Sequence, residues 1–194
     1  MHSGIMTKEN KVASKMKGRL DRQDWILAAV RALEENGVDG IKIVVIAQQL
    51  NVTSGSFYWH FKGLRQLQDA VLNHWEFALT DQIIQHARQF EGPPAERILN
   101  LMIEVLESDA AAADHAISVW ARRNLSVRKI YERTIDKRFE FAKWMFEEIG
   151  FSKIDAAARG RLIVTCMMGE SSTALKSKRN WKAKIKEQFD ILVS

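Results

Sequence analysis

The sequence contains few of the residues that cross-link a chain or interrupt helices. It has one cysteine, two prolines and ten glycines in 194 residues. A single cysteine excludes a disulfide within the chain, as is typical of proteins from a reducing cytoplasm. The scarcity of proline and glycine favours helices over a turn-rich β fold.

Long apolar runs and catalytic motifs are also missing. No run approaches the ~18 apolar residues of a membrane span. The polar, basic N-terminus lacks the apolar core of a secretion signal, whether Met1 or Met6 is the start. No glutamate has a histidine three residues later, and there is no Cys-x-x-Cys, His-Glu-x-x-His, Gly-x-Ser-x-Gly or phosphate-binding glycine loop. We therefore expect a cytoplasmic protein that has no membrane partner, is not an enzyme, and carries no metal or cofactor.

The charge is moderately positive and unevenly distributed. The net charge is +5, and 46% of the residues are hydrophobic, as in a globular protein. Residues 1–22 hold six lysines and arginines against two acids. The segment 1–19 is either a flexible basic arm that contacts nucleic acid or a solvated charged stretch. A second basic cluster, within 176–186, is interpreted as a solvated surface.

Apolar residues recur every three to four positions along most of the chain, which predicts an all-α protein of about nine helices. Thr53 or Ser54, Ser152 and Asn180 are expected to cap three of them. Asn36-Gly37 and Gly150 are expected to end two others. The expected helices cover 21–36, 44–50, 54–60, 63–90, 94–107, 114–123, 126–149, 153–176 and 181–192.

The segment NVTSGSFYWHF, residues 51–61, combines small hydroxyl residues with four aromatic rings. Two short helices flank a tight turn here, and Ile46, Ala47, Leu50, Val52 and Phe57 supply the apolar contacts that fix their angle. This pattern predicts a helix-turn-helix over about 44–61, whose second helix enters a DNA major groove. We place this DNA-binding domain at 20–66 and a helical body at 67–194.

The helix-turn-helix supplies the candidate DNA contacts. Small and hydroxyl residues at the start of the recognition helix let the backbone approach phosphates and let hydroxyls reach bases. Phe57 and Phe61 would face the core, and the alternative is that the other aromatic residues are also partly buried there. The predicted contact residues are Thr53, Ser54, Gly55, Ser56, Tyr58, Trp59, His60, Lys62 and Arg65.

Residues 25–71, WILAAVRALEENGVDGIKIVVIAQQLNVTSGSFYWHFKGLRQLQDAV, resemble the N-terminal domain of TetR-type transcriptional regulators. Three positions depart from the family pattern. Ile43 stands where a Thr or Ser usually caps the first motif helix, and Leu64 where a Lys or Arg usually meets a phosphate. Val44 stands where some members place a base-reading side chain. The remaining length and helical content match the family's ligand-binding and dimerisation domain.

The resemblance implies a homodimer that binds a palindromic operator in double-stranded DNA. The last two helices would pair with those of a second copy, or their apolar stripes could pack within one subunit. In the last helix the stripe is Trp181, Ile185, Phe189 and Leu192. In the preceding helix, small residues including Gly160 permit close approach. The candidate interface residues are Cys166, Gly169, Thr173, Trp181, Ile185 and Phe189.

The resemblance also implies a pocket for a small, mostly apolar effector in the middle helices. For each candidate residue the alternative is ordinary core packing. The function expected is a ligand-responsive repressor, with a ligand-independent or architectural DNA-binding protein as the alternative. The candidate pocket residues are Trp75, Met102, Val105, Trp120, Phe139, Met145 and Met167.

Overall fold

A computed structural model of the chain describes residues 20–108, 110–173 and 179–194, and all regular structure in these ranges is helical. The predicted arm at 1–19 lies outside them. The elements are α2 (Arg22–Asn36), η2 (Val38–Gly40), α3 (Ile43–Gln49), α4 (Ser54–Phe57), α5 (Leu64–Glu76), η3 (Phe77–Asp81), α6 (Gln82–Arg88), α7 (Pro94–Glu107), α8 (Ala110–Arg123), α9 (Leu125–Glu148), α10 (Lys153–Thr173) and α11 (Trp181–Val193). Because α5, η3 and α6 run on as one helix, these ranges hold nine helices and the short 3₁₀ turn η2. The all-α prediction is confirmed.

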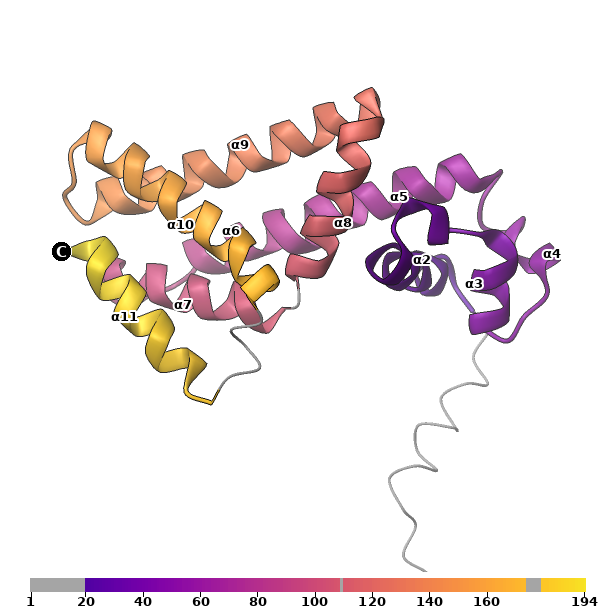
Figure 1. The fold of residues 1–194 in the computed structure, drawn as a ribbon, viewed down its shortest axis with the longest axis horizontal. Helices are drawn as coiled ribbons and strands as arrows, with labels where there is room; N and C mark the ends of the chain where they lie inside the picture. The colour runs from indigo at the N-terminus through magenta and orange to yellow at the C-terminus, as the bar shows by residue number, and fades with distance from the viewer. Residues whose placement is uncertain (1–19, 109, 174–178) are drawn as a thin grey trace, which may run out of the picture.

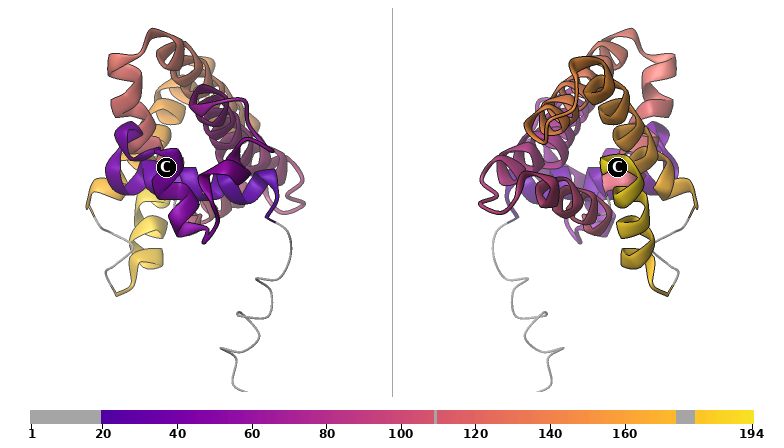
Figure 2. Two further views of the ribbon diagram at one scale, coloured as in Figure 1. Left: turned by 90° about the vertical axis from the view of Figure 1, so that its right-hand side faces the viewer. Right: turned by 90° about the vertical axis from the view of Figure 1, so that its left-hand side faces the viewer.

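The molecule is elongated, with the N-terminal helices α2, α3 and α4 at one end and α11 near the other (Figure 1). The continuous α5–α6 helix and the long α9 run lengthwise between them, and α8 crosses from the body toward the N-terminal end (Figure 1). Views along the long axis place the N-terminal helices in front from one side and α11 with the C-terminus in front from the other (Figure 2). The candidate DNA-binding helices and the last two helices therefore lie at opposite ends.

Two separate hydrophobic cores stabilise the molecule. The first surrounds Trp25, Phe57 and Trp75, and it includes Ile117 and Trp120 from α8. Each such side chain contributes about 1.5–3 kcal/mol when it is fully buried. The second core is built from α6, α7, α9, α10 and α11. Since α8 helps to fill the first core, the packing of the N-terminal unit extends beyond the expected boundary at residue 66.

Three helix starts follow the sequence closely. Asp21 accepts hydrogen bonds from the backbone of Gln23 and Asp24, and Asp24 completes a capping box with the backbone of Asp21. Asn124 caps α9 in the same manner. Ser152 Oγ accepts from the backbone N–H of Asp155, as expected.

Other helix boundaries correct the expectation. Neither Thr53 nor Asn180 makes a side-chain cap bond. Asn180 has a left-handed backbone with φ of 69°, whereas a capping residue is typically extended. Helix α8 begins at Ala110, not at 114, since alanine is the strongest helix former. None of the described helices has the length and apolar character needed to cross a bilayer.

The helix expected over 63–90 is not uniform. A π turn, η3, interrupts it at Phe77–Asp81 and buries the side chain of Thr80. Arg138 of α9 meets this turn, donating from Nε to Thr80 Oγ1 at 2.9 Å and from Nη2 to the Leu79 carbonyl at 3.2 Å. Such turns widen a helix by one residue and are often found at functional sites.

Candidate nucleic-acid interface and internal cavity

Helices α3 and α4 form the predicted helix-turn-helix. Asn51 has a left-handed backbone with φ of 56°, and the Val52 N–H donates to the Ala47 carbonyl at 2.9 Å, which closes the turn. Ala47 and Ile46 are buried between the helices. Helix α3 has no side-chain cap, and its cap position is Lys42, whereas Ile43 is the first residue of the helix and not its cap.

The aromatic residues of α4 and the turn after it divide into two groups. Phe57 and Phe61 are buried with stacked rings whose centroids are 5.3 Å apart, and Trp25 meets Phe57 edge-on. Tyr58 is 64% exposed and Trp59 is 82% exposed. The alternative of buried aromatic residues is therefore wrong for Tyr58 and Trp59. Two of the largest exposed apolar surfaces of the molecule lie at the predicted groove-facing site.

The other predicted contact residues lie around these rings. Thr53 and Gly55 are exposed, whereas Ser54, Ser56 and His60 are half-buried. Lys62 and Arg65 are exposed at the entry to α5. All nine predicted residues are thus within one continuous segment at the end of the molecule.

The departures from the family pattern have a structural setting. Leu64 is half-buried against the first core, which accounts for an apolar residue at this position. Val44 is 57% exposed on α3. Lys42, which the sequence reasoning missed, is exposed immediately before α3 and brings a positive charge to the same end. The sequence feature that could have identified Lys42 is its position directly before the first helix of the helix-turn-helix.

An internal cavity of about 630 Å³, counting its open mouth, lies between η3, α6, α7, α8, α9 and α10. Of the predicted pocket residues, Val105, Met145 and Met167 line it. The lining residues are Leu79, Thr80, Ile83, Ile84, Leu101, Val105, Asp114, Arg138, Phe141, Ala142, Met145, Ile163, Val164, Met167 and Met168.

Four predicted pocket residues do not line this cavity. Met102 is fully buried in the second core, and Trp120 belongs to the first. Phe139 is half-buried beneath the Arg161 guanidinium, 4.9 Å from the ring centroid. Trp75 is buried in the first core, but its Nε1 donates to Asp114, which does line the cavity. Helical periodicity predicts that such residues are buried, but it does not indicate which of the two cores they join.

The polar end of the cavity was missed by the sequence reasoning. Arg138 donates from Nη1 to Asp114 Oδ2 at 2.7 Å and from Nη2 to Asp114 Oδ1 at 3.0 Å. Trp75 Nε1 donates to Asp114 Oδ1 at 2.7 Å. Asp114 is only 5% exposed. The only signal in the sequence was a carboxylate directly after four alanines.

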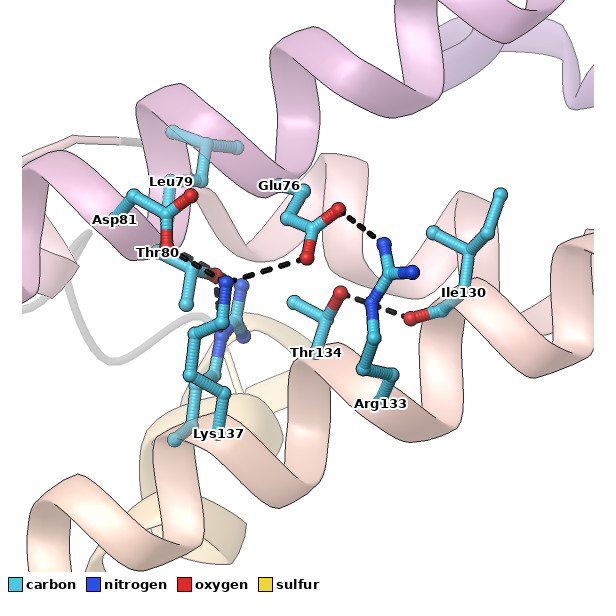
Figure 3. A network of polar contacts seen from close by, with 9 residues as sticks. Glu76, Leu79, Thr80, Asp81, Ile130, Arg133, Thr134 and Lys137 are labelled. Atoms are coloured by element: carbon cyan, nitrogen blue, oxygen red, sulfur yellow. Dashed lines mark hydrogen bonds and ion pairs between the residues drawn. The ribbon is translucent and has the colours of Figure 1, made fainter.

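A second polar network lies beside this cavity, between α5, η3 and α9 (Figure 3). Glu76 lies between Arg133 and Lys137, at 2.6 and 3.2 Å, and Lys137 also meets Asp81 at 2.8 Å. Burial alone would raise the pKa of Glu76, but hydrogen bonds and charges from Arg133 and Lys137 outweigh it and lower the pKa. The hydrogen bond to Asp81 raises the pKa of Lys137 despite its burial.

The predicted interface residues of α11 face their own chain. Ile185 and Phe189 are buried in the second core, and Trp181 is half-buried against it. This corrects the expectation that their stripe is available to a second copy. Gly160 likewise serves internal packing, because a Cβ there would come within 2.7 Å of the Lys143 backbone N.

The candidates on α10 are more varied. Gly169 is exposed, and Thr173 is the last residue of the helix. Cys166 is half-buried, and burial together with the charge of Glu170 raises the pKa of its thiol. Large apolar side chains that the prediction omitted are exposed instead on these two helices: Ile154 at 83%, Leu162 at 61% and Ile191 at 73%.

No group of three or more histidine, cysteine, aspartate or glutamate side chains is positioned to hold a metal ion within residues 20–108, 110–173 and 179–194.

Comparison with known proteins agrees with this geometry. Residues 26–71 match the family described as bacterial regulatory proteins, tetR family. The HTH-type transcriptional regulator AcrR of Shigella flexneri is 28% identical over 95 residues, which cover 49% of this chain and 44% of AcrR. The match thus spans less than half of that relative.

The fold similarity extends further than the sequence similarity. A TetR transcriptional regulator from Legionella pneumophila superposes with a TM-score of 0.77 at 13% identity, over 92% of this chain and all of that one. The transcriptional regulator FadR from Bacillus subtilis, solved in complex with stearoyl-CoA, has a TM-score of 0.63 at 17% identity, over 90% of this chain and 98% of that one. Residues 26–71 thus carry a tetR-type DNA-binding domain, and most of the chain shares the fold of these solved structures.

Proposed function

We propose that this protein is a transcriptional repressor that binds a palindromic DNA operator as a homodimer and is released by a small, mostly apolar ligand. The observation that carries the proposal is the exposure of Tyr58 and Trp59 directly after Phe57, the buried anchor of the helix-turn-helix. Exposed aromatic rings with an O–H and an N–H are costly on a surface that contacts only water, but they suit a groove wall and its phosphates.

DNA contact would come from two kinds of residue. Thr53, Ser56 and the exposed Val44 would meet base edges, through hydroxyls or through contact with a thymine methyl. Tyr58, His60, Lys62 and Arg65 would contact the phosphate backbone. The exposed Lys42 adds a positive charge to this surface.

The homodimer would form through α10 and α11. Ile154, Leu162 and Ile191 expose large apolar side chains on these helices. Helix α11 lies near the end opposite to the helix-turn-helix (Figure 1). Two copies joined there would present two recognition helices to successive half-sites, roughly 34 Å apart. The exposed Gly169 would allow the two helices to approach closely.

Ligand response would pass through α5 and α8. Helix α5 starts beside the helix-turn-helix and continues through η3 into the cavity wall. Asp114 of α8 joins Arg138 in this wall to Trp75 in the first core. A ligand that prefers one arrangement of these helices would shift the population of DNA-binding states. FadR, solved with stearoyl-CoA, is a regulator of the same fold with a bound ligand.

The proposal is tested by recovering fragments of sheared genomic DNA from the source organism on the purified protein and sequencing them. We expect a few sharply enriched palindromic sites, and their loss with Tyr58→Ala. Phe90→Ala, a change in the segment between α6 and α7, serves as the matched control and should retain all sites. Broad, salt-sensitive enrichment without a motif would contradict sequence-specific binding.

A further inference from the structure

The charges that line the cavity neutralise one another. Only Asp114 and Arg138 are charged among its lining residues, and they form a two-pronged ion pair at 2.7 and 3.0 Å. Asp114 is 5% exposed, and the Arg138 side chain is 14% exposed. The cavity wall therefore has a dipole but no net charge to offer a ligand.

Both charged groups are also close to their full number of hydrogen bonds. Arg138 uses four of its five N–H donors, on both oxygens of Asp114, on Thr80 Oγ1 and on the Leu79 carbonyl. Asp114 accepts a third bond from Trp75 Nε1. What remains for a ligand is one N–H of Arg138 Nη1, which has no acceptor among the described residues, and the hydroxyl hydrogen of Thr80.

These remaining groups are donors, and the rest of the wall is apolar. Apart from Thr80, Asp114 and Arg138, the lining consists of Leu, Ile, Val, Ala, Phe and Met side chains. Methionines 145, 167 and 168 are flexible and adapt to an irregular apolar shape. A ligand therefore meets a hydrocarbon surface with a small donor site at one end.

We infer that the cavity binds an uncharged, mostly apolar molecule with one hydrogen-bond-accepting oxygen, such as a ketone, ester or alcohol, placed at the unused N–H of Arg138 Nη1. This inference rests on the proposed ligand response and specifies its ligand. The oxygen would accept the unused N–H without disturbing the ion pair. The apolar part would fill the space between α6, α7, α9 and α10.

Charged ligands are disfavoured for a physical reason. A carboxylate would either share one guanidinium with the buried Asp114, leaving a net negative charge, or displace Asp114 and leave it unpaired. A cation would approach Asp114 beside the positive charge of Arg138. In both cases a buried charge is left uncompensated, whereas a neutral oxygen leaves the pair intact.

The inference is tested with four probes of equal chain length: 2-decanone, decane, decanoate and decyltrimethylammonium. Binding to the full chain is measured by isothermal titration calorimetry, and 8-, 12- and 14-carbon homologues allow for the cavity's length. We expect the ketone to bind about tenfold more tightly than each of the other three probes. The inference is overturned if decanoate or the ammonium probe binds most tightly. It is also overturned if no ketone of any length binds.

Asp114→Asn provides the decisive variant. It removes the negative charge while keeping the shape, so Arg138 becomes an uncompensated cation in the wall. The preference should then change to decanoate by about tenfold over 2-decanone. An unchanged preference for the ketone would show that the ion pair does not set the selectivity and would overturn the inference.

A second variant keeps the test valid if Asp114→Asn does not fold. Asp114→Leu with Arg138→Met replaces the pair by apolar groups, which proteins often tolerate well. This protein should show a smaller preference for 2-decanone over decane than the unmodified protein, because the donor of Arg138 is gone and only the Thr80 hydroxyl remains. An undiminished ketone preference would contradict the assigned position of the oxygen.

Operator binding separates this inference from the proposed function. Should decanoate release DNA while the ketone does not, ligand-responsive regulation stands and the neutral ligand is wrong. Should the ketone bind tightly without changing DNA occupancy, the ligand class stands and the coupling to DNA is wrong. Fluorescence anisotropy of a labelled operator, recorded with each probe, distinguishes the two results.

Discussion

At the scale of single residues, Asp114 joins two side chains from different helices. Its carboxylate holds Arg138 on α9 and Trp75 on α5, all of them in largely buried positions. Removing one member of a buried ion pair leaves the other charge unpaired, and this costs more than the pair itself contributes. We therefore expect Asp114 to be important for stability as well as for the proposed ligand selectivity.

We expect Asp114→Ala to reduce the free energy of unfolding by about 3–5 kcal/mol, because Arg138 and the Trp75 N–H lose their acceptor. The double change Asp114→Leu with Arg138→Met should cost far less. Urea unfolding of the three proteins measures the difference. An equal loss in the single and double variants would show that the ion pair has no special role.

Trp59 and Phe57 provide a matched pair for separating function from stability. Trp59 is 82% exposed, so Trp59→Ala should change the free energy of unfolding by less than about 0.5 kcal/mol. It should nevertheless lower operator affinity roughly tenfold, since an indole contact is lost. Phe57→Ala should cost about 3–5 kcal/mol through a cavity in the core. Thermal unfolding and operator titration together check both expectations.

The sequence was informative for residues whose role depends on near neighbours. Phe57 and Phe61 were expected in the core from their four-residue spacing, and they are there. The Asp114–Arg138 pair was missed because its members are 24 residues apart and meet only once α8, α9 and the π turn are packed together. A local sequence pattern does not predict such a long-range contact.

At the scale of elements, the polar network of Glu76 fastens the end of α5 to α9 (Figure 3). Arg133 is 62% exposed, so solvent and salt weaken the pairing. The network therefore makes a modest, pH-dependent contribution to holding the π turn against α9.

The folded-state pKa of Glu76 is lowered, so its contribution to stability is present above the unfolded pKa and is lost as pH falls through the folded one. We expect Glu76→Gln to be less stable than the unmodified protein by about 0.5–1 kcal/mol near neutral pH. The difference should begin to shrink below the ordinary pKa of 4.5 and vanish as the pH falls through the lowered folded pKa. Unfolding curves recorded across this range test the sign. A difference that grows in acid would contradict it.

Helix positions were largely predictable, and helix irregularities were not. The recurrence of apolar residues every three to four positions predicted the bounds of α2, α7 and α9 to within a residue or two of those observed. The π turn in the expected 63–90 helix left no signal, because its five residues fit an α-helical pattern equally well. The α11 stripe was correctly recognised as apolar, but periodicity gives the buried face without saying which chain buries it.

At the scale of the whole molecule, the proposed dimer places its contacts on the exposed apolar residues of α10 and α11. Leu162→Asp should convert the dimer to a monomer with little change in the stability of the subunit, because Leu162 is 61% exposed. Ile185→Ala should act in the opposite way, lowering subunit stability by about 2–5 kcal/mol. Sedimentation velocity reports the oligomeric state. A Leu162→Asp protein that remains dimeric would place the interface elsewhere.

The π turn at Phe77–Asp81 also has a genetic consequence. A π turn holds one residue more than the α turn it replaces, while the helix faces before and after it keep their directions. Phe77, which is 56% exposed, is the member with the least packing to lose. One codon can therefore be lost here with the recognition helix and the second core still in register, because the π turn then becomes an ordinary α turn. Such a deletion would change the cavity wall independently of the helix-turn-helix.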